Sequence, residues 1–182
     1  ERIYQAALTP SAIPLPVPFA YVANTYSNSV TVINTTTNAV TATVAVSLPY
    51  GVAITPDGAA VYVTNFSGNS VSVISTATNT VTATIPVGTG PNKPAVTPDG
   101  SKVYVPNGTS GTVSVISTAT NTVTATITGV GDARDVAITP DGARAYLARA
   151  NGNSISVVNT STNTITGTIV VGGFSLGIAI TP

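Results

Sequence analysis

The chain has 182 residues, enough for one domain with a sizeable core. Only 7% of its residues are charged, against roughly 25% in an average soluble protein, and the six basic and six acidic residues cancel. This balance excludes the basic surface that nucleic-acid binding needs, and an apolar content of 43% excludes an intrinsically disordered chain. No apolar stretch is long enough for a membrane-spanning helix, so we expect no membrane insertion.

Internal repeats organise the sequence. Thr-Pro-Asp-Gly occurs at Thr55–Gly58, Thr97–Gly100 and Thr139–Gly142, at intervals of 42 residues, and Thr181-Pro182 begins a further copy. Two more markers keep the same phase: a tyrosine at Tyr21, Tyr62, Tyr104 and Tyr146, and a Thr-Asn pair ending at Asn38, Asn79, Asn121 and Asn163. A period of this length indicates a repeat architecture.

Each repeat predicts four short strands. In the second repeat, the apolar segment 51–54 is followed by the Thr-Pro-Asp-Gly turn and by segment 61–64. Segments 71–74 and 81–85 alternate apolar and small polar residues, and Asn79 lies in the turn between them. No segment has helical spacing, which excludes the helical repeat arrays.

Four strands per 42-residue repeat predict an all-β fold, a β-propeller of about four blades in a single domain 1–182. We expect blades at 6–46, 51–86, 94–128 and 135–171, with 176–182 starting a further blade. The first inner strand is expected at Ala6–Thr9, before the proline-rich loop Pro10–Phe19. The strand expected at Gly177–Thr181 has no sheet of its own, so we expect further blades of the same chain or self-association, as a closed ring or a fibre.

One run of residues identifies a related family. Tyr62-Val-Thr-Asn65 is followed by Asn69-Ser-Val-Ser-Val-Ile74 and then by Thr78-Asn79-Thr-Val-Thr-Ala-Thr-Ile85. This run, with the Thr-Pro-Asp-Gly turn before it, resembles the repeat of the YVTN β-propeller family. The resemblance covers nearly all of residues 21–182. The tetrad varies elsewhere, ending in Asn24, in Asn107 after Pro106, and in Arg149.

The resemblance implies a compartment more than an activity. Members of the YVTN family are mostly cell-surface, surface-layer or periplasmic proteins, commonly with about seven blades. Similar propellers include lactonase-like and lyase enzymes. Because one propeller fold serves many functions, any activity must be argued from the site itself.

Catalysis has few candidate groups in this chain. Histidine and cysteine are absent, which leaves carboxylates, Lys93, tyrosines and hydroxyls. Asp57, Asp99 and Asp141 recur at one turn position, which favours turn formation. We therefore predict no catalytic residue, no metal site and no cofactor.

The loops that enter the inner strands are the candidate ligand-binding positions, because they vary while the scaffold repeats. The candidates are Tyr50, Asn92, Lys93, Asp132, Arg134 and Asp135. Asp132 and Asp135 have two interpretations: surface ion pairs with Arg134, or a contribution to a Ca²⁺ site, which needs roughly six to eight oxygen ligands. No dense string of such ligands accompanies them.

Four asparagines match the N-glycosylation pattern: Asn34, Asn65, Asn107 and Asn159. Low charge, the absence of Cys and Met, and abundant Thr and Asn favour a non-enzymatic extracellular or cell-surface structural protein. Two alternatives remain open: a module that binds a glycan or peptide through the variable loops, and a fragment of a lactonase-like or lyase enzyme.

Overall fold

The computed structural model describes residues 18–182, so the strand predicted at 6–9 lies outside the described residues. Residues 18–182 form fifteen β-strands and one short 3-10 helix, Thr25–Ser27. The strands are β1 (Phe19–Asn24), β2 (Ser29–Asn34), β3 (Ala39–Ala45), β4 (Pro49–Ile54), β5 (Ala60–Asn65), β6 (Ser70–Ser75), β7 (Thr80–Pro86), β8 (Ala95–Val96), β9 (Lys102–Asn107), β10 (Thr112–Ser117), β11 (Thr122–Ile127), β12 (Ala133–Ile138), β13 (Arg144–Arg149), β14 (Ser154–Asn159) and β15 (Thr164–Val170).

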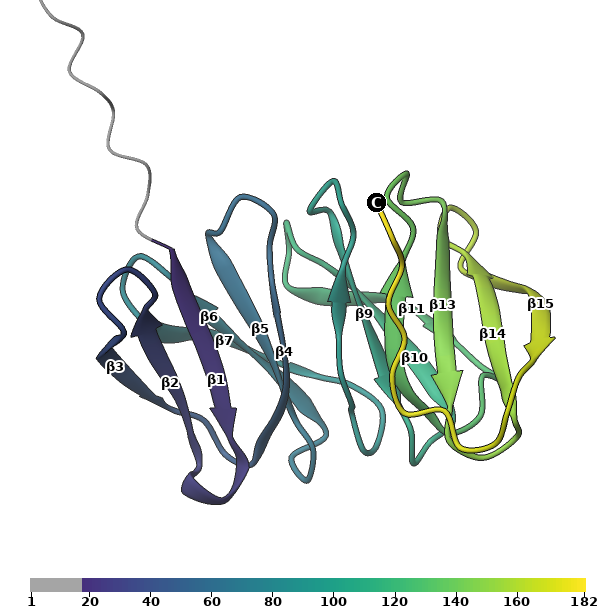
Figure 1. The fold of residues 1–182 in the computed structure, drawn as a ribbon, viewed down its shortest axis with the longest axis horizontal. Coiled ribbons are helices and arrows are strands. Elements are labelled where there is room, and N and C mark those ends of the chain that lie inside the picture. Colours follow the sequence, from purple (N-terminus) through teal and green to yellow (C-terminus); the bar gives the residue numbers. More distant parts are fainter. Residues whose placement is uncertain (1–17) are drawn as a thin grey trace, which may run out of the picture.

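The strands form four antiparallel meanders that follow one another in an arc (Figure 1). The first meander has three described strands, β1-β2-β3, and the others have four each: β4 to β7, β8 to β11, and β12 to β15. We call these four sheets blades 1 to 4. The prediction of an all-β propeller with four-stranded blades is confirmed.

The Thr-Pro-Asp-Gly segments form the hairpin turns that the sequence predicts. In the second turn, the Gly100 N–H donates to the Thr97 carbonyl at 2.8 Å, and Gly100 has a φ of +72°. The Asp99 carboxylate accepts from the Thr97 hydroxyl at 2.5 Å and from the Ser101 N–H at 3.0 Å. The corresponding carboxylates of Asp57 and Asp141 accept from the Ala59 and Ala143 N–H groups. These three aspartates are turn formers, as predicted.

An irregularity recurs in the outer hairpin of every blade. In blade 2 the register between β6 and β7 shifts between Val73 and Ile74, and the Thr82 hydroxyl donates to the Val73 carbonyl at 3.2 Å. Thr41, Thr124 and Thr166 make the same bond in the other blades. A β-bulge increases local twist. The recurrent threonine of the outer strand therefore contributes to the shape of the blade.

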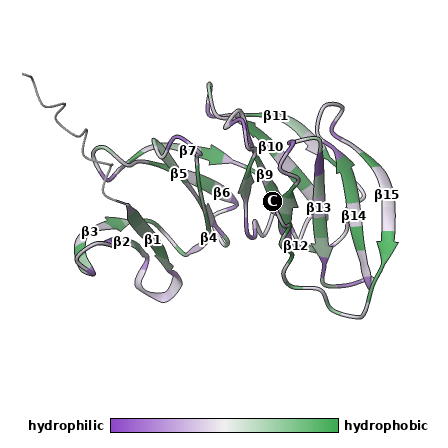
Figure 2. Ribbon diagram, turned by 45° about the horizontal axis from the view of Figure 1, so that its top comes forward, coloured by the Kyte–Doolittle hydropathy of each residue, from purple (hydrophilic) through white to green (hydrophobic). Residues whose placement is uncertain are grey.

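The cores lie between blades, where each blade packs on the next. Val32 and Val44 of blade 1 pack against Val61, Val63 and Ile74 of blade 2. Figure 2 shows hydrophobic residues concentrated along the strands that meet in this way. The apolar residues of one blade are therefore buried only when its neighbour is in place.

A tyrosine hydroxyl joins each pair of successive blades. The Tyr62 hydroxyl donates to Asn121 Oδ1 at 2.7 Å, in the outer turn of blade 3. Asn121 has a φ of +52°, as the Thr-Asn turns predict. The same bond runs from Tyr21 to Asn79 at 2.9 Å and from Tyr104 to Asn163 at 2.7 Å. We call this contact the tyrosine–asparagine staple.

The segment after β15 differs from the prediction. Residues 175–182 run extended but form no strand, although the sequence predicts one at 177–181. The segment is instead held by one bond, from the Ile178 N–H to Asp135 Oδ2 at 3.4 Å.

The turn carboxylate predicts a stability change in acid. Hydrogen bonds from Thr97 and from Ser101 lower the pKa of Asp99 from 3.8 to about 2. A lowered pKa stabilises the folded state above the ordinary pKa, and this contribution is lost as the pH falls from about 4 to about 2. Asp99→Asn keeps the turn acceptor but cannot titrate. The melting temperatures of the two proteins should therefore converge over that pH range; a constant difference would contradict the assignment.

Candidate functional site

The two rims of the arc differ in how strictly they repeat. One rim carries the Thr-Pro-Asp-Gly and Thr-Asn turns, which are nearly the same in every blade. The other, at the lower edge of Figure 1, carries the loops that precede the inner strands and those that follow the tyrosine-bearing strands. We call it the loop face. All six predicted ligand-binding residues lie on or next to it.

The tetrad asparagine is a structural residue of this face. Asn65 ends β5 and its Nδ2 donates to the hydroxyls of Ser70 and Ser72, both at 2.9 Å. Asn107 does the same in blade 3 with Thr112 and Ser114. In blade 4 an arginine, Arg149, takes this place, and its guanidinium donates to Ser154 at 3.2 Å. The asparagine thus fastens the hairpin next to its connecting loop.

This role corrects part of the glycosylation prediction. Asn65 and Asn107 are 5% and 0% exposed, and both use the nitrogen to which a glycan would be attached. The folded chain offers no accessible nitrogen for an oligosaccharide at these two residues, so the structure argues against glycosylation there. Asn34 and Asn159 are partly exposed, and only their Oδ1 atoms bond, to N–H groups of the following turn. Glycosylation at these two residues stays a prediction.

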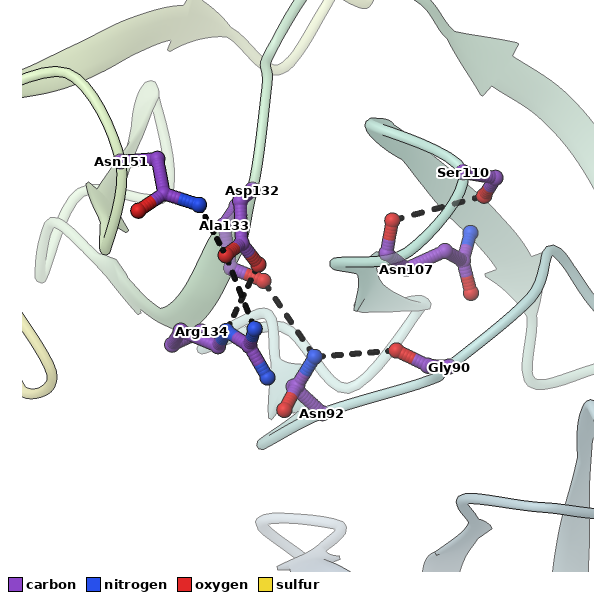
Figure 3. Close-up of polar contacts among 8 residues, drawn as sticks. All are labelled: Gly90, Asn92, Asn107, Ser110, Asp132, Ala133, Arg134 and Asn151. Atoms are coloured by element: carbon purple, nitrogen blue, oxygen red, sulfur yellow. Dashed lines mark hydrogen bonds and ion pairs between the residues drawn. The ribbon is translucent and has the colours of Figure 1, made fainter.

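Asn92 is predicted as a ligand-binding residue of the loop face, but the structure buries it. Its side chain is fully buried, and its Nδ2 donates to the Gly90 carbonyl at 2.9 Å and reaches the Ala133 carbonyl at 3.5 Å (Figure 3). A ligand on the surface cannot contact it. Asn92 instead links the loop before β8 to β12 of the next blade.

Asp132 and Arg134 form a close ion pair. Arg134 Nε lies 2.6 Å from Asp132 Oδ1, and Arg134 Nη2 donates to Asp132 Oδ2 at 2.8 Å. The Asn151 amide donates to the same Oδ2 at 3.2 Å, as Figure 3 shows. The Asp132 side chain is only 14% exposed. Its Oδ2 therefore accepts from two protein donors and its Oδ1 lies against the Arg134 guanidinium, which fits the ion-pair interpretation better than the Ca²⁺ one.

Lys93 and Asp135 form a second, looser pair across two blades. Lys93 Nζ lies 3.5 Å from Asp135 Oδ2, and the lysine side chain is 52% exposed. Asp135 Oδ1 also accepts from its neighbour Val136 N–H at 2.9 Å. Among residues 18–182, no three His, Cys, Asp or Glu side chains gather closely enough to hold a metal ion.

Tyr50 lies in a hollow that the sequence did not reveal. The hollow has a volume of about 240 Å³ and is lined by Tyr50, Leu48 and Phe66 together with Arg134 of blade 4. Leu48 and Phe66 are not among the residues that the sequence pattern predicts for binding. Phe66 directly follows the tetrad. This position differs in every blade, and that variation could have marked it as a candidate binding position; the other blades have Thr25, Gly108 and Ala150.

The comparisons with known proteins agree with this architecture. A family model described as YNCE-like beta-propeller matches residues 17–173. The chain belongs to the YNCE-like β-propeller family. No curated protein matches it significantly. Within residues 18–182, no helix is long and apolar enough to cross a membrane.

Many solved protein chains are similar to this one. One of them is Kuenenia stuttgartiensis hydrazine synthase, with a TM-score of 0.81 and 28% sequence identity. The match covers 85% of this chain but only 46% of that chain. The YNCE-like chain therefore corresponds to about half the length of this neighbour.

The ion pair predicts a local stability effect. Asp132→Asn leaves the partly buried Arg134 guanidinium without its counter-charge, and we expect a loss of about 1 kcal/mol in the free energy of unfolding. Lys93→Gln is the matched control and should change it by less than about 0.5 kcal/mol, because the lysine is half exposed and its contact with Asp135 is long, at 3.5 Å. Chemical denaturation of both variants measures this. Equal losses would show that the Asp132–Arg134 pair contributes no more to the free energy of unfolding than the Lys93–Asp135 pair does.

Proposed function

We propose that this protein is a non-enzymatic extracellular or cell-surface scaffold that assembles by docking one blade flank against another. The observation that carries the proposal is that the two outer flanks of the arc bear the same residues that hold the blades together inside it. The proposal has two halves, one for each flank.

The outer flank of blade 4 leaves core residues uncovered. Ile169 is 47% exposed, whereas its equivalents Val44, Ile85 and Ile127 are 6%, 3% and 4% exposed beneath the next blade. Tyr146 is the fourth staple tyrosine. It borders a hollow of about 430 Å³ that Ile169 also lines. This flank supplies the donor half of a staple.

The outer flank of blade 1 is the complementary surface among the described residues. Val22 is 41% exposed, whereas its equivalents Val63, Val105 and Leu147 are fully buried against the preceding blade. Asn38 has a φ of +57°, like the acceptor asparagines inside the arc. This flank supplies the acceptor half of a staple.

A second copy of the chain fits both halves. With Tyr146 of one copy donating to Asn38 of the next, the contact repeats the one already made three times within the chain. Such a head-to-tail interface closes into a ring or continues as a fibre, depending on its rotation. Further blades of one longer polypeptide would satisfy the same two flanks in the same way.

An extracellular location is supported by composition and resemblance. Only 7% of the residues are charged, and the chain has no Cys or Met. The YVTN-type repeat points to cell-surface and surface-layer proteins. A propeller fragment of an enzyme is the second candidate, since the similar Kuenenia protein is named a synthase. In that case the catalytic groups would come from elsewhere than the ion-paired residues of the loop face.

The docking proposal predicts self-association of these 182 residues. Light scattering should give a mass above 18.1 kDa that rises with concentration. Ile169→Asp should abolish the association, because it places a charge in an apolar contact. Tyr146→Phe should weaken it roughly fivefold, the effect of one hydrogen bond of about 1 kcal/mol.

Val170→Asp is the matched control. Val170 is adjacent on β15 and 84% exposed, and its replacement should leave the association unchanged. A well-folded species that remains at 18.1 kDa at high concentration would exclude docking between copies.

A further inference from the structure

The hollow around Tyr50 is built from three blades. Thr25 comes from the loop after β1, Leu48 and Tyr50 from the start of blade 2, and Arg134 from β12 of blade 4. It lies on the loop face, away from the two flanks proposed to dock. Any ligand bound in this hollow would therefore not compete with the proposed docking of the flanks.

Two aromatic rings form its wall. The ring centroids of Tyr50 and Phe66 lie 5.7 Å apart with an interplanar angle of 46°. Tyr50 is 46% exposed even though it is one of the larger apolar side chains of the protein. Tilted rings at this separation leave faces and edges on which a third ring can pack.

The charge of the hollow is already balanced. Arg134 is its only charged lining residue, and Asp132 neutralises it through contacts of 2.6 and 2.8 Å. An anionic ligand would compete with that carboxylate and gain little. The planar guanidinium can still stack on an aromatic ring.

The hollow offers few groups to a sugar. Besides Arg134 and the Tyr50 hydroxyl, its polar side chains are those of Thr25 and Ser67. The Thr25 hydroxyl already donates to the Pro49 carbonyl at 2.7 Å. A sugar ring in this hollow would find few side-chain partners for its hydroxyls, whereas an aromatic ring needs none.

Backbone strain is a second, independent sign of function. Leu48 has a φ of +45°, a left-handed conformation that is unfavourable for a leucine. The equivalent position of blade 3 is Gly90, which adopts a φ of +64° without that cost. The strained loop is held by Asn28 Oδ1, which accepts from the Leu48 N–H at 2.8 Å. Strain of this kind is concentrated at binding sites.

We infer that this hollow is a binding site for a peptide segment, which it anchors through one aromatic side chain. Its volume of about 240 Å³ suits a single ring, and it opens to solvent. The remainder of the peptide would lie along the loop face. The Leu48 side chain completes the apolar wall of the hollow.

The test is an NMR titration of the ¹⁵N-labelled chain with N-acetyl-Ala-Phe-Ala-amide. We expect saturable shifts at residues 48, 50 and 66, and weaker binding by p-cresol, which presents the ring alone. Methyl α-glucopyranoside should cause no saturable shifts. Self-association is followed in the same samples by light scattering, so that failure of docking and failure of binding are separate results.

Three variants locate the site. Tyr50→Ala should reduce the peptide affinity by roughly tenfold, since it removes one of the two rings. Leu48→Gly should also reduce the affinity while the melting temperature stays or rises, because glycine removes the backbone strain. Tyr26→Ala is the control: Tyr26 is 99% exposed and lies outside the hollow, so binding should be unchanged.

Three outcomes would overturn the inference. The first is the absence of saturable shifts with the peptide. The second is equal binding of p-cresol or of the glucoside, which would assign the hollow to a small aromatic molecule or to a glycan. The third is full peptide affinity in Leu48→Gly and Tyr50→Ala.

Discussion

The contact between successive blades is the interaction on which the rest of the structure depends. A single meander of four short strands cannot bury both of its faces, so each blade is stable only against a neighbour. The tyrosine–asparagine staple sets the distance and register of that contact, because the Tyr62 hydroxyl reaches an asparagine 59 residues further along the chain. Three such bonds, with the apolar residues beside them, produce the arc.

The same contact explains why the two rims diverge. The rim of the Thr-Pro-Asp-Gly and Thr-Asn turns includes the asparagine acceptors, so its residues are constrained in every repeat. The contacts between blades on the loop face differ from one pair of blades to the next, and its residues vary between blades. Asn92 shows that a position that varies between blades can still be structural, because its side chain bonds the next blade.

Membership in the YNCE-like family accounts for the propeller fold but does not specify a function. Any function must be argued from the loop face and the flanks. The flank residues Ile169 and Val22 and the hollow around Tyr50 are separate features, at the sides and on the loop face of the arc. An assembly that uses the flanks would leave the loop face accessible. Docking and peptide binding are therefore compatible in one protein.

The sequence by itself determined the blade, its turns and the order of its strands. Those features depend on contacts within a single repeat, and the repetition makes them visible three times: Asp99 and Asn121 take the turn roles that their spacing predicts. Residues 177–181, where the repeat predicts an inner strand, form no strand in the described structure and contact Asp135 through the Ile178 N–H.

Only the tertiary structure decided what lies at the surface. The sequence pattern could not show that Asn65 and Asn107 are buried while Asn34 is partly exposed, because all three match the same acceptor pattern. Nor could it bring Arg134 next to Tyr50, since the curvature of the arc places two residues from different blades in one hollow. Burial and such proximity depend on how blades pack, and that packing is a property of the whole arc.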